Sequence, residues 1–342
     1  MAAGGRLATV LRAAGLAVGG AGLWAAARSR PPADRPPPVP PAELPPARVV
    51  TVPGRGEMFL REAAGPRGSW RPTVVLLHGW IFPADLNWFS CYQALGQVAP
   101  VIACDHRGHG RGPRPAEPFR LADAADDVAA LLRHLGTGPA VLVGYSMGGT
   151  IAQLAWRRHP DVVDALVLCA TSATFSASMR DRWVWRSMGL LQLIWRLVPR
   201  HWTEAAIGAQ ARGALPVSLS RMIHEHTPRQ VLDLLPWMLA EVSRGSAEDL
   251  AEAGRELGRF DARPWLGQVD VPTAVLIATR DRLVPARNQR DLAARIPGAF
   301  VQELPVDHDA VIARRDLFVP ALLEAVGQVT RGRAAPRAST AG

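Results

Sequence analysis

Short apolar runs alternate with segments of helical periodicity over much of the chain. Five runs have the length and composition of buried β-strands: residues 74–77, 101–104, 140–143, 273–278 and 299–304. Helical patterns follow two of them, over residues 150–156 and 311–326. From Thr171 to about Pro264 the alternation stops, and apolar residues recur at helical spacing only. The pattern therefore predicts a strand-and-helix core interrupted by a helical segment.

A serine lies between the run at 140–143 and the helix that follows it, within Gly144-Tyr145-Ser146-Met147-Gly148. A sharp strand-to-helix turn strains the serine backbone and leaves no room for side chains at the flanking glycine positions. The hydroxyl then lies at a helix N-terminus, where backbone N–H groups and the helix dipole favour negative charge. We therefore predict that Ser146 is a nucleophile.

A serine nucleophile needs a base that takes its proton and a carboxylate that orients the base. His308 lies in the loop between the last predicted strand and the last predicted helix, which suits the base. Asp281 lies in the polar loop after the run at 273–278, which suits the carboxylate. We predict these two residues as the partners of Ser146.

Three other aspartates compete with Asp281 for the role of the orienting acid. Asp307 and Asp309 flank His308 directly, and Asp270 is close to Asp281 in the chain. Side chains adjacent to a histidine in the chain rarely point at its ring nitrogen. We therefore interpret Asp307 and Asp309 as a solvated loop edge.

Two further turns follow apolar runs in the first third of the chain. The first is His78-Gly79-Trp80, where we interpret His78 as a structural residue that holds the loop by hydrogen bonds. The second runs from Asp105 to Gly112, and its glycines and charges predict a tight, hydrogen-bonded turn at the rim of the site. A phosphate-binding loop is disfavoured there, because no Lys-Ser/Thr pair follows.

Together these motifs resemble the α/β-hydrolase superfamily in both identity and order, over roughly residues 48–330. The resemblance implies an α/β fold with a mostly parallel eight-stranded sheet, helices on both faces and a helical lid inserted after the sixth strand. It implies acyl-enzyme chemistry without a cofactor, with the backbone N–H groups of Trp80 and Met147 as the oxyanion hole. Asp307 departs from the family pattern, which usually has a small residue before the histidine.

The residue at the nucleophile position narrows the choice within this superfamily. Haloalkane dehalogenases and epoxide hydrolases carry aspartate there, so Ser146 disfavours both activities. We predict a serine-dependent carboxylic ester hydrolase that acts on an apolar small-molecule ester, such as an acyl-glycerol or a lysolipid. Carbon–carbon bond hydrolysis, cofactor-free haloperoxidation and acyl transfer on the same triad remain open. A non-catalytic hydrolase-like binding scaffold is the alternative from another class.

The net charge of +9 does not indicate a nucleic-acid partner. The chain contains no lysine, its arginines are scattered among acidic residues, and no nucleic-acid-binding motif accompanies them. The three cysteines form no disulfide framework, and no metal-ligand spacing occurs. We interpret Cys104 and Cys169 as small buried residues on strands.

Both ends of the chain differ from its middle in composition. Residues 16–27 form an uncharged run followed by Arg28 and Arg30, which favours a membrane anchor. A cleaved secretory signal and a disordered or surface-lying N-terminus remain open. The proline-dense stretch after it predicts an extended spacer. The predicted organisation is therefore an N-terminal anchor or signal segment (1–30), a Pro-rich linker (31–47), the hydrolase domain (48–330, with the lid at about 172–264) and a disordered tail (331–342).

Tryptophan and methionine are concentrated in the predicted lid, and two interpretations of them remain open. Helix packing explains most of them, whereas some could line an apolar acyl pocket. The residues are Met179, Trp183, Trp185, Met188, Trp195, Trp202, Met222, Trp237 and Met238.

Overall fold

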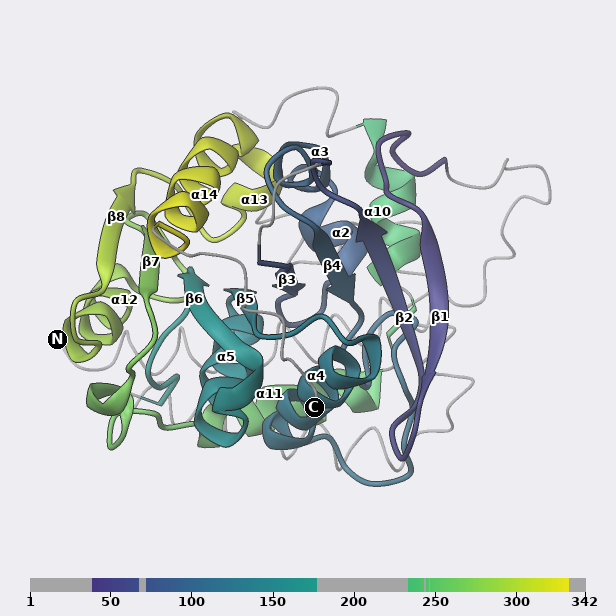
Figure 1. Ribbon diagram of the computed structural model, residues 1–342, viewed down its shortest axis with the longest axis horizontal. Helices are drawn as coiled ribbons and strands as arrows, with labels where there is room; N and C mark the ends of the chain where they lie inside the picture. The colour runs from purple at the N-terminus through teal and green to yellow at the C-terminus, as the bar shows by residue number, and fades with distance from the viewer. Residues whose placement is uncertain (1–38, 68–71, 177–232, 243, 246, 332–342) are drawn as a thin grey trace, which may run out of the picture.

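An eight-stranded sheet forms the centre of the protein in the computed structural model (Figure 1), which describes residues 39–67, 72–176, 233–242, 244–245 and 247–331. The strands lie in the spatial order β1-β2-β4-β3-β5-β6-β7-β8. Strand β2 is antiparallel to β1 and β4, and every other neighbouring pair is parallel. The prediction of a mostly parallel eight-stranded sheet is confirmed. The strands are β1 (Ala47–Val52), β2 (Gly56–Ala63), β3 (Val74–Leu77), β4 (Val101–Cys104), β5 (Ala140–Tyr145), β6 (Val163–Cys169), β7 (Thr273–Ala278) and β8 (Phe300–Leu304).

Strands β3 and β4 are apolar along their whole length because both of their faces are buried. In β3, Val75 and Leu77 belong to one core cluster and Val74 and Leu76 to the other. Successive side chains of a strand point to opposite faces, so a strand covered on both sides needs apolar residues at every position. This explains why β3, β4 and β7 have the bounds that the apolar runs predict.

Helices cover both faces of the sheet. Helices α3 and α14 contribute to the core on one face, and α4 and α5 to the core on the other (Figure 1). The predicted C-terminal helix is divided in two at Arg314, whose backbone is not helical (φ −126°, ψ 46°). The helices of the core are α2 (Ala84–Trp88), α3 (Tyr92–Gly96), α4 (Leu121–Leu135), α5 (Met147–Arg158), α12 (Ala286–Arg295), α13 (Ala310–Ala313) and α14 (Arg315–Val329), with short 3-10 turns at Pro160–Val162 and Leu266–Gln268.

Two helices are described in the segment between β6 and β7, α10 (Leu235–Val242) and α11 (Ala247–Arg259). Trp237 and Met238 of α10 are buried in one core cluster, which supports the packing interpretation for these two residues. The rest of the predicted lid, including its other tryptophans and methionines, lies outside the described residues. The lid as a whole therefore stays a prediction.

The predicted N-terminal segment (1–30), residues 31–38 of the predicted linker and residues 332–342 of the predicted tail also lie outside the described residues. Strand β1 begins at Ala47, within the predicted linker. Within the part that the structure describes, no helix is long and apolar enough to cross a lipid bilayer.

All three cysteines are fully buried and form no disulfide. Cys104 and Cys169 end strands β4 and β6, as predicted, and Cys91 directly precedes α3. Burial disfavours the charged thiolate and raises the pKa of the Cys91 and Cys104 thiols to about 12. These thiols therefore behave as small apolar groups.

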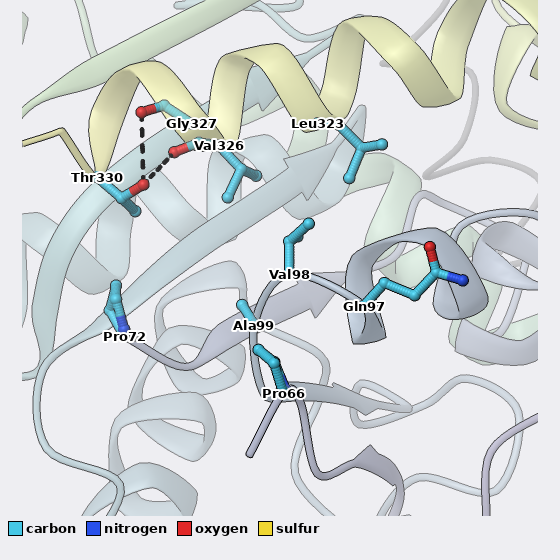
Figure 2. A pocket seen from close by; sticks show the side chains of 9 residues that line it. All are labelled: Pro66, Pro72, Gln97, Val98, Ala99, Leu323, Val326, Gly327 and Thr330. Atoms are coloured by element: carbon cyan, nitrogen blue, oxygen red, sulfur yellow. Dashed lines mark hydrogen bonds between the residues drawn. The ribbon is translucent and has the colours of Figure 1, made fainter. Parts of the chain in front are cut away.

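An open apolar cavity of about 440 Å³ lies at the amino ends of β3 and β4 (Figure 2). Pro72 and Ala99, which precede these strands, face Leu323 and Val326 of α14 across it. No charged side chain is among the described residues that line it. The cavity is therefore at the opposite edge of the sheet from the loops that follow β5, β7 and β8.

Candidate active site

Ser146 occupies the turn between β5 and α5 in a strained backbone conformation. Its φ of 54° and ψ of −114° place it outside the regions that residues with a side chain normally adopt. It is one of three non-glycine residues with positive φ among those that the structure describes, with Ile81 and Ala170. The predicted strand-to-helix elbow is present.

The glycines around Ser146 are required by close backbone contacts. A Cβ atom on Gly148 would lie 2.0 Å from the Leu77 carbonyl oxygen of β3. One on Gly144 would lie 2.4 Å from the carbonyl oxygen of Gly148. Neither position can carry a side chain without moving the backbone of β3 or α5, which is the predicted reason for both glycines.

A continuous chain of hydrogen bonds joins the three residues predicted as a triad. The Nε2 atom of His308 lies 3.1 Å from Ser146 Oγ, and its Nδ1 atom lies 2.8 Å from Asp281 Oδ2. The side chains come from the turns after β5, β7 and β8, whose carboxyl ends meet at one edge of the sheet. Ser146 is only 8% exposed to solvent, so the residue is nearly enclosed by its neighbours.

The environment of His308 favours its protonated form. Burial alone lowers the pKa of an imidazole, but the charge and hydrogen bond of Asp281 oppose that effect, and Asp307 and Asp309 add to the opposition. The net result is that the pKa of His308 is raised above its ordinary value. A histidine in this setting can accept a proton and hold the resulting positive charge.

The carboxylate of Asp281 is held from several sides. Its Oδ1 atom accepts hydrogen bonds from the backbone N–H groups of Leu283 (2.8 Å) and Val284 (2.7 Å). Its Oδ2 atom accepts one from Nε2 of Gln289 (2.9 Å) in addition to the His308 bond. The sequence analysis missed Gln289. The signal was its position on the buried stripe of α12, three and four residues before Leu292 and Ala293.

The interpretation of Asp307 and Asp309 as a solvated loop edge is wrong. Asp309 is only 4% exposed, next to the start of α13. Asp307 Oδ1 accepts the backbone N–H groups of His308 (2.8 Å) and Arg282 (3.0 Å), and its carboxylate pairs with the Arg282 guanidinium. The loop turns inward at this point, so Asp307 links the loop that carries His308 to the one that carries Asp281.

Tyr145 is a second site residue that the sequence analysis missed. Its hydroxyl donates a hydrogen bond to the backbone carbonyl of His308, and its ring packs edge-on against the imidazole with centroids 5.7 Å apart. Tyr145 immediately precedes Ser146, so one turn of the chain carries the predicted nucleophile and contacts the predicted base. Its place within the glycine-flanked motif was the available signal.

The loop after β3 lies against Ser146 on the other side. A Cβ atom on Gly79 would be 3.5 Å from Ser146 Cβ, so the Gly79-Trp80 turn directly adjoins the serine. Trp80 donates its indole N–H to the Leu250 carbonyl of α11 (2.8 Å), and Ile81 after it has a φ of 75°. Met147 is the buried first residue of α5. The positions agree with an oxyanion hole, whose assignment to Trp80 and Met147 stays a prediction.

His78 holds this loop by hydrogen bonds, as the sequence analysis predicts. Its Nε2 atom accepts the backbone N–H of His106 (2.9 Å), so its Nδ1–H donates to the Gly79 carbonyl (2.8 Å). The His106 and His109 rings pack on it with centroids 4.2 and 5.4 Å away. Burial lowers the pKa of His78 to about 4 and that of His109 to about 3, and it also lowers the pKa of His106. We call these three residues the histidine cluster.

The turn from Asp105 to Gly112 is tight and hydrogen-bonded, as predicted. Asp105 accepts the backbone N–H groups of Ala84 (2.7 Å) and Arg111 (2.8 Å). A Cβ atom on Gly112 would lie 2.2 Å from the His106 carbonyl oxygen. Arg111 extends from this turn and pairs with Asp85 and with Glu241 of α10. The turn thus connects α2 to α10 in the segment between β6 and β7.

Within the described part of the chain, no group of histidine, cysteine or acidic side chains has an arrangement that could hold a metal ion.

Comparison with known families agrees with this geometry. The family model described as the alpha/beta hydrolase fold matches residues 72–314, which include all three triad positions and the loop after β3. That match covers more than half of the chain. The chain belongs to the α/β-hydrolase family.

Relatives of this hydrolase include esterases and lactonases. It is 33% identical to a pimeloyl-[acyl-carrier protein] methyl ester esterase of Chromobacterium violaceum, over 74% of this chain and 93% of that protein. It is 24% identical to 3-oxoadipate enol-lactonase 2 of Acinetobacter baylyi, over 64% of this chain and 75% of the relative. The crystal structure of the enol-lactonase from Burkholderia xenovorans superposes with a TM-score of 0.67 at 25% identity, covering 82% of this chain and 99% of the other.

The predicted resemblance, the fold class and the enzyme class of the hydrolase are therefore confirmed. The family and its relatives support an ester hydrolase.

Proposed function

We propose that this hydrolase cleaves carboxylic esters through an acyl-enzyme intermediate formed on Ser146. The observation that carries the proposal is the unbroken hydrogen-bond chain from Ser146 through His308 to Asp281, with distances of 3.1 and 2.8 Å. Such a chain activates a hydroxyl that is otherwise a poor nucleophile. The strained elbow places that hydroxyl at the start of α5, where developing negative charge is stabilised.

The reaction proceeds in two halves on these groups. His308 Nε2 takes the Ser146 proton while Oγ attacks the ester carbonyl, and the backbone N–H groups of Trp80 and Met147 stabilise the oxyanion. The protonated imidazole then donates to the leaving alcohol oxygen, which gives the acyl-serine. A water molecule attacks the acyl carbon as His308 removes its proton, and collapse returns that proton to Oγ and releases the acid. Asp281 holds the imidazole in the required tautomer and stabilises its positive form.

We propose an apolar ester as the substrate, with acyl-glycerols and lysolipids as the class to test first. The relatives act on a methyl ester and an enol-lactone, as their names state, so carboxylic esters of different alcohols are the common chemistry. The tryptophans and methionines of the predicted lid suit an apolar acyl chain. A panel of p-nitrophenyl esters from acetate to palmitate tests this directly. We expect kcat/KM to rise from the acetate to medium or long chains, and a maximum at the acetate would contradict the lipid assignment.

A fluorophosphonate probe tests the nucleophile itself. We expect labelling of Ser146 in the folded wild-type protein and none in Ser146→Ala, together with a loss of ester turnover of about 10⁴-fold or more. Ser176→Ala is the matched control, because the Ser176 hydroxyl donates to the Gly258 carbonyl and has no contact with the triad in these hydrogen bonds. Absence of labelling in folded wild-type protein would favour the binding scaffold. Equal turnover by Ser146→Ala and wild type would remove the esterase assignment.

We also propose that residues 1–30 attach the hydrolase to a membrane, with residues 31–47 as the spacer. The uncharged run at 16–27 and the arginines after it support this proposal. The full chain should be recovered with membranes after an alkaline wash, and a variant lacking residues 1–30 should not. Recovery of a shortened chain outside the cell would instead indicate an exported protein.

A further inference from the structure

Gln289 is a fully buried polar residue in direct contact with the predicted catalytic acid. It lies in the first half of α12, and it is 0% exposed. Its Nε2 atom donates to Asp281 Oδ2 (2.9 Å) and to the Val284 carbonyl (2.7 Å), and its Oε1 atom accepts the backbone N–H of Ala278 (2.9 Å). The side-chain amide therefore has a partner on both its oxygen and its nitrogen.

These partners determine which way the amide faces. The backbone N–H of Ala278 can only donate, so it must meet the amide oxygen of Gln289. The Val284 carbonyl can only accept, so it must meet the nitrogen. The nitrogen is thus directed to Asp281 by β7 and the following loop, independently of the aspartate itself.

Gln289 also completes the hydrogen bonding of the Asp281 carboxylate. An ionised carboxylate offers about four acceptor positions. Two on Oδ1 are taken by the Leu283 and Val284 backbone, and two on Oδ2 are shared by Gln289 and His308. Without Gln289, the His308 imidazole would be the one side-chain donor to Oδ2 among these contacts.

We infer that Gln289 is a positioning residue of the active site, which fixes the Asp281 carboxylate against rotation and shares its negative charge with His308. The inference rests on the proposed function for its kinetic consequence. Gln289 acts through Asp281 and is not itself placed next to Ser146. The hydrogen bond from the Gln289 amide stabilises negative charge on Asp281 Oδ2. Without this bond, more of that charge is available to stabilise a proton on the imidazole.

The test is Gln289→Met, which keeps the length of the side chain and removes both donors. We expect kcat to fall about tenfold, with KM little changed, because the imidazole is less well oriented. We also expect the pKa of His308 to rise by about 0.5 to 1 unit and the acidic limb of kcat/KM to move up by the same amount. The charged groups that face His308 are Asp281, Asp307 and Asp309, and all three are unchanged in this variant.

Gln153→Met is the matched control. Gln153 is also a fully buried helical glutamine, and its amide donates to the Gly149 carbonyl on α5, outside the triad. It should lower the melting temperature to a similar extent and leave the pKa of His308 unmoved. Equal kinetic and pH profiles for the two glutamine variants would reduce Gln289 to a structural residue and overturn the inference.

A second variant covers the case in which Gln289→Met does not fold. Gln289→Leu has a similar volume and likewise offers no donor to Asp281 Oδ2. The pKa of His308 should again exceed the wild-type value, because Oδ2 loses the same hydrogen bond. A wild-type pKa in this folded variant would contradict the inference.

The pKa of His308 is read by NMR of its imidazole and needs no turnover. A wild-type protein without ester hydrolysis or Ser146 labelling would therefore remove the proposed function and leave the test of Gln289 intact. Normal turnover with an unmoved His308 pKa in both Gln289 variants would remove the inference alone.

Discussion

The half-buried His308 and a cluster of three buried histidines lie close to the elbow of this hydrolase, and their pKa values move in opposite directions. His308 contacts the Asp281 carboxylate, and its pKa is raised. The histidine cluster (His78, His106 and His109) has backbone partners, and the pKa values of its members are lowered, to about 4 for His78. Burial acts in the same direction in both places. The Asp281 carboxylate opposes this effect at His308, whereas burial dominates in the histidine cluster.

This difference in pKa suits two different roles, which are holding a loop and transferring a proton. A neutral imidazole with fixed donor and acceptor nitrogens can hold a loop in one geometry, as His78 does between Gly79 and His106. A base must instead gain a proton and lose it again within each turnover. The two kinds of histidine lie on neighbouring loops. The ring of His308 is hydrogen-bonded to a carboxylate, whereas no described carboxylate is hydrogen-bonded to the rings of the histidine cluster.

The largest expected effect comes from Asp281→Asn, which removes the charge that distinguishes His308 from the cluster. We expect the His308 pKa to fall and kcat to drop by about 10⁴-fold, because the imidazole loses its tautomer control and its counter-charge. NMR titration and steady-state kinetics measure the two effects. A His308 pKa that stays raised would show that Asp307 and Asp309 are sufficient to raise it. Asp281 would then not be the cause of the contrast with the histidine cluster.

The histidine cluster should make the protein sensitive to acid. Unfolded histidine titrates near pH 6.5, whereas His78 and His109 titrate at about 4 and about 3 in the folded protein. The unfolded chain therefore binds more protons below pH 6.5, and the free energy of unfolding falls as the pH decreases through 6.5 towards 4. His78 alone accounts for about 3 kcal/mol of this loss. Urea denaturation between pH 8 and 4 measures it.

The control for this prediction is a variant with one titrating member fewer. His109→Asn should reduce the slope of stability against pH between 6.5 and 4, whatever its effect at pH 8. His308 contributes in the opposite sense, since its raised pKa adds stability that is present below pH 6.5 and lost as the pH rises through the folded value. An unchanged slope in His109→Asn would exclude His109 as a source of the acid sensitivity.

A smaller effect is expected from the two tyrosines, which form a natural matched pair. Tyr145→Phe removes the hydrogen bond to the His308 carbonyl and should lower kcat by about threefold to tenfold, which corresponds to about 1 kcal/mol. Tyr92 is also buried, but its hydroxyl has no hydrogen-bond partner among the described residues. Tyr92→Phe should therefore leave kcat unchanged. Equal kinetics in the two variants would show that the hydrogen bond from Tyr145 to His308 does not contribute to turnover.

The smallest expected effect tests the link between the loop after β3 and α11. Trp80→Phe keeps the backbone N–H of the proposed oxyanion hole and removes the indole bond to Leu250, so kcat/KM should fall about twofold to fivefold. Trp156→Phe loses an indole bond to Asp270, away from the triad, and should lower stability without this kinetic change. A kinetic loss in both variants would indicate a general packing defect.

The sequence predicts the central strands β3, β4, β5 and β7, because strands buried on both faces must be largely apolar. It gives no run for β6, whose pattern is interrupted by Asp164. It also predicts that Ser146, Asp281 and His308 lie together, and the hydrogen bonds between them agree, while their catalytic roles stay a prediction. The short run 74–77 and the bounds of β3 agree to the residue.

The residues that the sequence did not predict are those whose role depends on a distant partner. Gln289 matters because α12 turns its buried stripe toward Asp281, and Tyr145 because β5 lies beside the loop that carries His308. Asp307 is half-buried against Arg282, and Asp309 is buried at the start of α13. Local composition gives the residue types of a loop, but only the packed structure gives the neighbours that the loop faces.

The burial of Cys91, Cys104 and Cys169 has a practical consequence. With all of its native thiols shielded and protonated at neutral pH, the folded enzyme offers no competing site to a maleimide dye or a spin label. A cysteine introduced at the exposed Leu283, two residues beyond Asp281, would then react selectively. A reporter group at that position would follow changes in the loop that carries Asp281, in the wild-type cysteine background.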